Sequence, residues 1–78
     1  MKLNTVFSRK LFSARSRLGY TQSQVAEAVS ITLRWYQRIE RGERVPSFPV
    51  ALSLMSFLGI EIHDLSKAVS LIVPLPTN

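Results

Sequence analysis

The positions of helix-starting and helix-ending residues constrain this chain more than any other feature of its sequence. Residues that can cap a helix N-terminus are Asn4 or Thr5, Thr21, Thr32 and Ser47. Glycines, which commonly follow the last residue of a helix, are Gly19, Gly42 and Gly59. Between them, apolar residues recur every three or four positions, as do Val6, Phe7, Leu11, Ala14 and Leu18. The sequence therefore predicts an all-α chain of short helices.

These signals predict five helices. We expect the first to begin after a cap at Asn4 or Thr5 and to end at Gly19, and the others to cover residues 22–29, 33–41, about 48–58 and about 62–69. Thr21 and Gln24 are spaced to form a capping box at the start of the second helix. The prolines near the C-terminus exclude regular helix there. We expect one domain over residues 1–69 and a short apolar tail over residues 70–78.

The composition favours a folded domain and excludes several kinds of site. Of the 78 residues, 46% are apolar and 19% are charged, which suits one domain with a single core. Cysteine is absent and His63 is the single histidine, so disulfides and thiolate metal sites are excluded, and we expect no metal and no cofactor. No catalytic motif surrounds His63, so we do not expect an enzyme.

No stretch of the sequence resembles a membrane span or a secretion signal. The longest apolar runs, such as Leu71 to Val73, are far shorter than the roughly 18 residues that cross a bilayer. Lys2 is not followed by the apolar segment of a signal peptide. We expect a cytoplasmic protein with no membrane partner, and no small-molecule ligand is evident.

Charge is distributed unevenly along the chain. Residues 1–44 carry nine basic and three acidic side chains, whereas residues 45–78 carry one basic and two acidic side chains. A basic half beside a near-neutral half favours one face that binds a polyanion, since neutralised phosphates release counterions. The charge by itself is weak evidence for nucleic acid.

The second and third expected helices are separated only by a short break at Ser30 and Ile31. Helices joined by so tight a turn must cross steeply, which presents the N-terminal half of the later helix outward. This arrangement and its residues resemble the Xre-like helix-turn-helix domains of phage Cro and CI repressors over about residues 11–65. The matching residues are Ala14-Arg15, Leu18-Gly19-Tyr20-Thr21-Gln22, Val25-Ala26, Val29, Ile39-Glu40-Arg41-Gly42, Arg44, Pro46-Ser47 and Leu58-Gly59-Ile60. The resemblance implies a compact five-helix lambda-repressor-like domain that binds double-stranded DNA.

The resemblance makes the helix over residues 33–41 the one that reads bases in the major groove. Tyr36 and Ile39 should face the core, and the candidate base-reading residues are Leu33, Arg34, Gln37 and Arg38. Arg and Gln side chains have the donors and acceptors that recognise guanine and adenine edges, and a leucine can contact a thymine methyl group. The alternative is that these residues are simply the solvated face of an amphipathic helix.

The family pattern also implies phosphate contacts and one ion pair. The candidate phosphate-binding residues are Thr21, Gln22, Arg41, Gly42 and Arg44, although a cap is the simpler role for Thr21. Glu40 lies in the last turn of its helix, where the helix dipole disfavours an acid, so it needs a partner. The resemblance implies that this partner is Arg15.

The sequence departs from the common family pattern in three places, one of which is the tail beyond Leu65, which lies outside the resemblance. Ser30 stands where a turn glycine is frequent, and a positive φ would strain it mildly. Trp35 adds an aromatic residue beside Tyr36; it could pack against the core, stack on a sugar-phosphate edge or contact a partner.

The expected function is a transcriptional regulator, a repressor, that binds a near-palindromic operator as a homodimer, because one short helix reads few base pairs. We expect dimerisation through residues 57–75, with candidate residues Phe57, Leu71, Ile72 and Val73. The alternative for the tail is that it covers its own core. The alternative function is a protein-interaction module of the same fold, such as an antitoxin or an adaptor.

Overall fold

Four α-helices form the part of the chain that the structure, a computed structural model, describes, residues 3–61. They are α1 (Leu3–Leu18), α2 (Gln22–Ala28), α3 (Leu33–Glu40) and α4 (Phe48–Leu58). The all-α prediction is confirmed for these residues. The expected fifth helix at residues 62–69 and the candidate dimerisation residues Leu71, Ile72 and Val73 lie outside the described residues.

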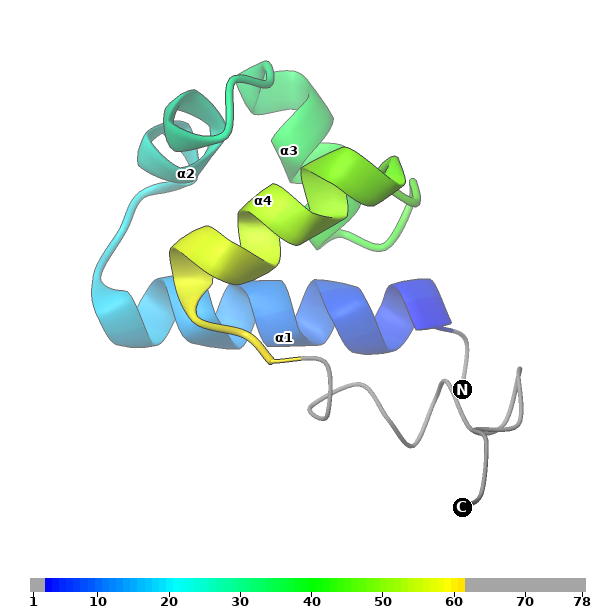
Figure 1. Ribbon diagram of the computed structural model, residues 1–78, viewed down its shortest axis with the longest axis horizontal. Coiled ribbons are helices and arrows are strands. Elements are labelled where there is room, and N and C mark those ends of the chain that lie inside the picture. Colours follow the sequence, from blue (N-terminus) through cyan, green and yellow to red (C-terminus); the bar gives the residue numbers. More distant parts are fainter. Residues whose placement is uncertain (1–2, 62–78) are drawn as a thin grey trace.

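The long helix α1 forms the base on which the other helices pack. Figure 1 shows α1 at the bottom of the helical part, α4 running obliquely above it, and α2 and α3 at the top. α1 contacts both α3 and α4, and α2 contacts both of the same helices. The chain therefore holds α2 and α3 together at one end of a single core.

Side-chain caps start three of the helices where the sequence predicts them. Thr21 Oγ1 accepts a hydrogen bond from the Gln24 amide, and the Thr21 amide donates to Gln24 Oε1, which is the predicted capping box. Thr32 accepts from the Trp35 amide and Ser47 from the Val50 amide. These bonds satisfy donors that the first turn of a helix leaves without intrahelical partners.

The prediction of a cap at Asn4 or Thr5 is wrong. α1 already begins at Leu3, so both residues lie within its first turn. Each residue added to an existing helix gains a backbone hydrogen bond, and no glycine or proline in this stretch stops the helix from extending toward the N-terminus.

A residue with left-handed backbone follows each helix. Gly42 takes φ of 77° after α3, and Ser30 takes φ of 60° after α2, as anticipated from its place in the turn. The Ile31 amide donates to the Ala26 carbonyl and the Ser30 amide to the Glu27 carbonyl, which is the Schellman arrangement. The α2–α3 turn is therefore fixed by backbone hydrogen bonds although it lacks glycine.

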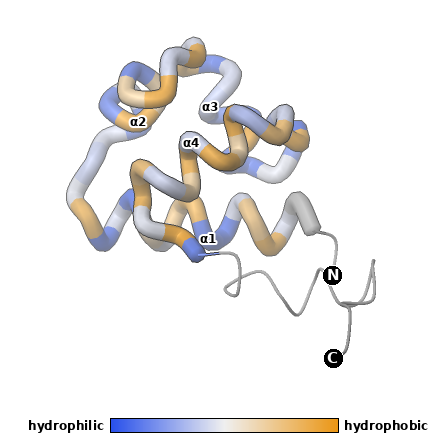
Figure 2. Tube along the Cα trace, viewed as in Figure 1, coloured by the Kyte–Doolittle hydropathy of each residue, from blue (hydrophilic) through white to orange (hydrophobic). Residues whose placement is uncertain are grey.

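The core lies where the four helices meet. Its fully buried large side chains are Leu11, Val25, Tyr36, Ile39, Leu54 and Leu58. The hydropathy colouring in Figure 2 shows hydrophobic positions recurring along each helix. Leu18, which the periodicity grouped with the core residues of α1, is 48% exposed because it is the last residue of the helix, at the edge of the packed region.

Two negative findings concern the described residues 3–61. None of their helices combines the length and the apolar composition needed to cross a bilayer. Within the same range, no three His, Cys, Asp or Glu side chains gather as they would around a metal ion.

Candidate nucleic-acid interface

Glu40 is the centre of a hydrogen-bonded network that joins the first three helices. Its Oε1 atom lies 2.8 Å from Arg15 Nη2, and its Oε2 atom accepts from Arg15 Nε at 2.9 Å. The ion pair expected between these residues is thus present, with two parallel bonds that fix the guanidinium and carboxylate in one plane. Arg15 also donates from Nη1 to the Tyr20 carbonyl at 3.0 Å, which ties the α1–α2 turn to the pair.

Two further donors complete the shell around the Glu40 carboxylate. The Tyr36 hydroxyl donates to Oε2, and Gln22 Nε2 donates to Oε1 at 3.2 Å. The side chains of Arg15 and Glu40 are only 15% and 5% exposed. The acid at the unfavourable C-terminal end of α3 is therefore compensated by three partners from three helices.

The pKa values reflect this burial and bonding. Burial alone would raise the pKa of Glu40, but hydrogen bonds from Arg15, Tyr36 and Gln22 outweigh it and lower that pKa below its ordinary value. The hydrogen bond to Glu40 raises the pKa of Arg15. Burial, followed by the bond to Glu40, raises the pKa of Tyr36. The pair therefore stays ionised and the phenol stays protonated at neutral pH.

A second link connects the network to the exposed face of α3. Gln37 Nε2 donates to Gln22 Oε1 at 3.2 Å, so the side chain at the start of α2 bridges Gln37 and Glu40. Gln22 is the candidate phosphate contact and Gln37 a candidate base contact. The structure thus brings these two residues into direct contact, and their orientations depend on each other.

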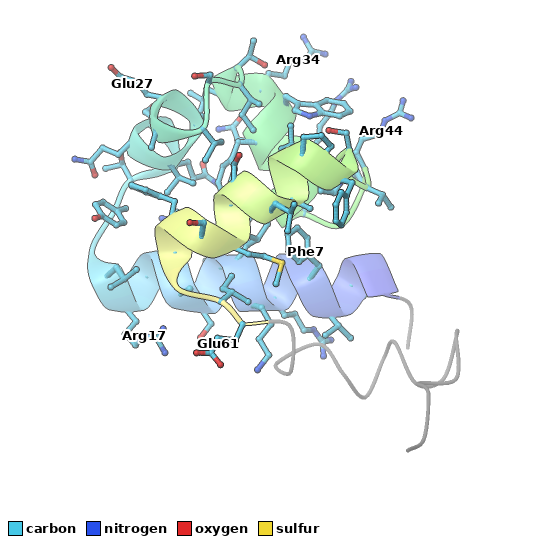
Figure 3. The ribbon with its side chains drawn as sticks, viewed as in Figure 1. Phe7, Arg17, Glu27, Arg34, Arg44 and Glu61 are labelled. Carbon is cyan, nitrogen blue, oxygen red and sulfur yellow. The ribbon has the colours of Figure 1, made fainter. Side chains whose placement is uncertain are left out.

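The candidate base-reading residues lie on one face of α3, and the core residues lie on the other. Tyr36 and Ile39 are buried, as predicted. Leu33 and Arg34 are exposed, whereas Gln37 and Arg38 are half-buried. In Figure 3 the labelled Arg34 side chain points away from the body of the molecule, at the end opposite Arg17.

Trp35 is half-buried and packs against the core. Of the three roles left open by the sequence, the structure shows packing, and the contacts with a sugar-phosphate edge or a partner stay predictions.

The candidate phosphate contacts that follow α3 differ in their exposure and in their present contacts. Arg41 Nε lies 2.6 Å from Glu43 Oε2 in an exposed ion pair, and such a pair is readily exchanged for a stronger anion. Arg44 is exposed, and Figure 3 shows it at the same end of the molecule as Arg34. Gly42 lies between them, in the turn that ends α3.

Sequence reasoning missed several of these contacts. The Tyr36–Glu40 bond was signalled by the spacing of four residues, which places both side chains on one face of a helix. The Arg41–Glu43 pair has no such helical signal. The Arg15 guanidinium also lies 5.5 Å from the centre of the Phe12 ring, a contact that depends on how the Arg15 side chain is held by Glu40.

Comparison with known proteins agrees with this geometry. A family model described as a helix-turn-helix domain matches residues 6–67. With two short capped helices joined by a tight turn and an exposed helix face beyond it, the chain belongs to the Xre-like helix-turn-helix family.

Two curated relatives from Bacillus subtilis (strain 168) are similar to this chain. The uncharacterized HTH-type transcriptional regulator YgzD is 33% identical over 55 residues, which cover 70% of this chain and 83% of that protein. The uncharacterized HTH-type transcriptional regulator YazB is 31% identical over 61 residues, which cover 78% and 88% respectively. No solved structure matches the chain.

Proposed function

We propose that this protein is a transcriptional regulator that binds double-stranded DNA sequence-specifically, with α3 in the major groove. The single observation that carries this proposal is the α3 surface: Leu33 and Arg34 are exposed, and Gln37 is held beside Gln22. Arg34 is suited to a guanine edge and Gln37 to an adenine edge, with Leu33 near a thymine methyl group. Arg38 flanks this set.

The neighbouring polar residues would hold the duplex in register. Gln22, Arg41, Arg44 and the Gly42 turn would contact phosphates on either side of the groove, and Thr21 would do so while capping α2. The rigid network around Glu40 supports this role, because it fixes α2 and α3 relative to each other before DNA arrives.

The regulator acts as a homodimer on a near-palindromic operator and represses by occupying it. α3 has only eight residues, so one copy reads too few base pairs to select a site in a genome, whereas two copies related by a two-fold axis read two half-sites. Repression then requires only that the bound dimer exclude polymerase.

The test is selection from a random duplex pool of about 30 bp, long enough for two half-sites one helical turn apart. Binding is measured by fluorescence anisotropy at several salt concentrations. The wild type should enrich a two-fold symmetric site, and Arg34→Ala/Gln37→Ala should lose this preference while keeping salt-sensitive binding to any duplex.

Arg17→Ala is the matched control. Arg17 is an exposed arginine like Arg34 but points from the opposite end of the molecule (Figure 3), so its removal should leave the selected sequence unchanged. Equal loss of selectivity in both variants would contradict the assignment of α3. A wild type that binds no DNA at low salt would contradict the function itself.

A further inference from the structure

Two consecutive hydrogen bonds connect Gln37, on the candidate base-reading face, to a buried carboxylate. Gln37 Nε2 donates to Gln22 Oε1 at 3.2 Å, and Gln22 Nε2 donates to Glu40 Oε1 at 3.2 Å. The side chain of Glu40 is only 5% exposed and is held by Arg15 and by the Tyr36 hydroxyl. We call the three side chains of Glu40, Gln22 and Gln37 the relay.

The carboxylate gives the relay a direction. An ionised carboxylate accepts hydrogen bonds and has none to donate. Burial acts to raise the pKa of Glu40, but hydrogen bonds from its neighbours outweigh it and lower that pKa, so the group is ionised at neutral pH. Gln22 must therefore turn its NH2 group toward Glu40, which leaves its carbonyl oxygen as the atom that faces Gln37.

This direction limits what Gln37 can present to DNA. A glutamine amide has two N–H donors and one carbonyl acceptor. Because Gln22 Oε1 accepts one N–H of Gln37, one N–H and the carbonyl oxygen remain for a base. In the major groove adenine presents one acceptor and one donor, whereas guanine presents two acceptors. The groups left on Gln37 therefore match adenine and do not match guanine.

Tyr36 holds the carboxylate from the side of the core. Its side chain is fully buried, and its hydroxyl donates to Oε2, whereas Gln22 contacts the other oxygen of Glu40. Removing the hydroxyl keeps the ion pair with Arg15 but takes away one of the two hydrogen bonds to Oε2. The carboxylate can then turn away from Gln22, so a change inside the core should reach the base-reading face.

We propose that Glu40 and Gln22 are positioning residues for base recognition: the buried carboxylate orients the Gln22 amide, which in turn orients Gln37 and makes it selective for adenine. Tyr36, which holds the carboxylate, belongs to the same set. The inference rests on the proposed DNA-binding function and names residues that determine its specificity. Gln22 then has two separable roles, because a phosphate contact adds affinity for any duplex, whereas its bond to Gln37 adds preference for one base.

The decisive measurement is base preference at the operator position that Gln37 reads. This position is the base pair of the selected operator at which Gln37→Ala loses selectivity. Anisotropy competition compares duplexes with adenine and with guanine there, and we expect the wild type to prefer adenine by about tenfold, the size of one bidentate contact. The base pair found in the same way with Arg34→Ala is the internal reference.

Gln22→Met is the main variant, because methionine has a similar length but lacks the amide. It should reduce the adenine preference to about twofold or less while leaving the preference at the Arg34 position unchanged. Arg44→Ala is the matched control, since it removes a proposed phosphate contact outside the relay. It should weaken binding to every duplex and keep the adenine preference of the wild type.

Tyr36→Phe and Ile39→Val test the connection to the core. Each removes one heavy atom from a buried side chain of α3, but only Tyr36→Phe takes a donor away from Glu40. Tyr36→Phe should lower the adenine preference by at least about twofold, and Ile39→Val should leave it unchanged. In a Gln37→Ala background, Tyr36→Phe should have no effect on base preference. Circular dichroism confirms that each variant is folded.

The relay is also measured without DNA. In ¹H–¹⁵N spectra of the free protein, the side-chain amide of Gln22 should shift in Tyr36→Phe and stay in place in Ile39→Val. A Gln22 amide that does not respond to Tyr36→Phe would overturn the proposal whether or not the protein binds DNA.

Two results with DNA would also overturn the proposal. One is a wild type without adenine preference at the Gln37 position, and the other is a Gln22→Met variant that keeps this preference. The proposed function fails by a different result, which is a wild type without salt-dependent duplex binding.

Discussion

At the scale of single residues, the position of Glu40 is explained by its partners and not by its helix. An acid in the last turn of α3 opposes the helix dipole, yet Glu40 is held by Arg15, Tyr36 and Gln22. Because the carboxylate is shielded from water, removing one of these donors lowers the stability of the fold more than removing an exposed ion pair would. The same residue therefore determines both how α1 and α3 are joined and how Gln22 is oriented.

Glu40→Gln should lower the free energy of unfolding by about 3 kcal/mol at pH 7, because it leaves the buried Arg15 charge without its counterion. The pKa of Glu40 is lowered from 4.5 in the folded protein, so its contribution is fully present above the unfolded pKa. It is lost as the pH falls through the folded pKa. The difference in the free energy of unfolding between the wild type and Glu40→Gln should therefore shrink progressively below pH 4.5.

Urea unfolding followed by circular dichroism at a series of pH values measures this difference. Glu27→Gln is the control, because Glu27 is an exposed acid on α2. A constant difference between wild type and Glu40→Gln from neutral to acid pH would contradict the role of the ionised carboxylate.

At the scale of helices, the connection between α2 and α3 determines how the reading helix is presented. The connection is short because α2 ends in a Schellman arrangement at Ser30 and α3 begins at the Thr32 cap only two residues later. Ser30 takes a left-handed conformation that L-residues avoid. The turn thus keeps its geometry at some cost in stability.

Ser30→Gly should stabilise the fold by about 0.5–1 kcal/mol, because glycine adopts this φ without strain. The greater conformational entropy of glycine in the unfolded chain offsets only part of this stabilisation. Thermal unfolding should show the midpoint rising by a few degrees. Ser30→Val should destabilise, since a β-branched residue is strained most at positive φ. A destabilised Ser30→Gly variant would show that the Ser30 side chain makes a contribution beyond its backbone conformation.

At the scale of the whole molecule, basic residues and the uncharged residues 45–60 occupy different parts of the chain. Arg34 of α3 and Arg44 of the following turn lie at one end (Figure 3), and residues 45–60, which include α4, carry no charged side chain. In the proposed homodimer both copies of α3 must stay free to reach DNA. DNA contacts and self-association should therefore be separable by mutation.

Inserting about 5 bp between the half-sites of a selected operator should weaken binding by at least about tenfold, because half a helical turn places the half-sites on opposite sides of the duplex. Inserting about 10 bp, a full helical turn, is the control for length, because it places both half-sites on the same side of the duplex again. Anisotropy titration measures both. Equal affinity for all spacings would show that the two copies bind independently.

Much of the fold follows from the sequence alone. Thr21, Thr32 and Ser47 predicted three helix starts, because a cap is a contact between residues only three positions apart. The glycines predicted helix ends for a similar local reason. The start of α1 was not predicted, since Asn4 and Thr5 are also tolerated within a first turn.

Sequence patterns predicted which residues of α3 form its exposed face, but not the hydrogen bonds that hold those side chains in place. The burial of Tyr36 and Ile39 follows from their spacing of three, whereas the Gln22–Gln37 bond joins residues 15 positions apart and requires α2 and α3 to be placed first. The Arg15–Glu40 pair was anticipated only through resemblance to a family, because no local rule pairs residues 25 positions apart.

Local contacts within a few residues were thus determined by the sequence, since backbone geometry fixes which neighbours can touch. Tertiary structure alone decided which of the leucines Leu52 and Leu54 in α4 was covered. Leu52 and Leu54 are equally hydrophobic and two positions apart, yet Leu54 is fully buried and Leu52 is half exposed. The physical reason is that Leu54 lies on the side of α4 that packs into the core, where α4 contacts α1 and α2, whereas Leu52 does not. No alternation of charged and apolar residues marks that side in residues 45–60.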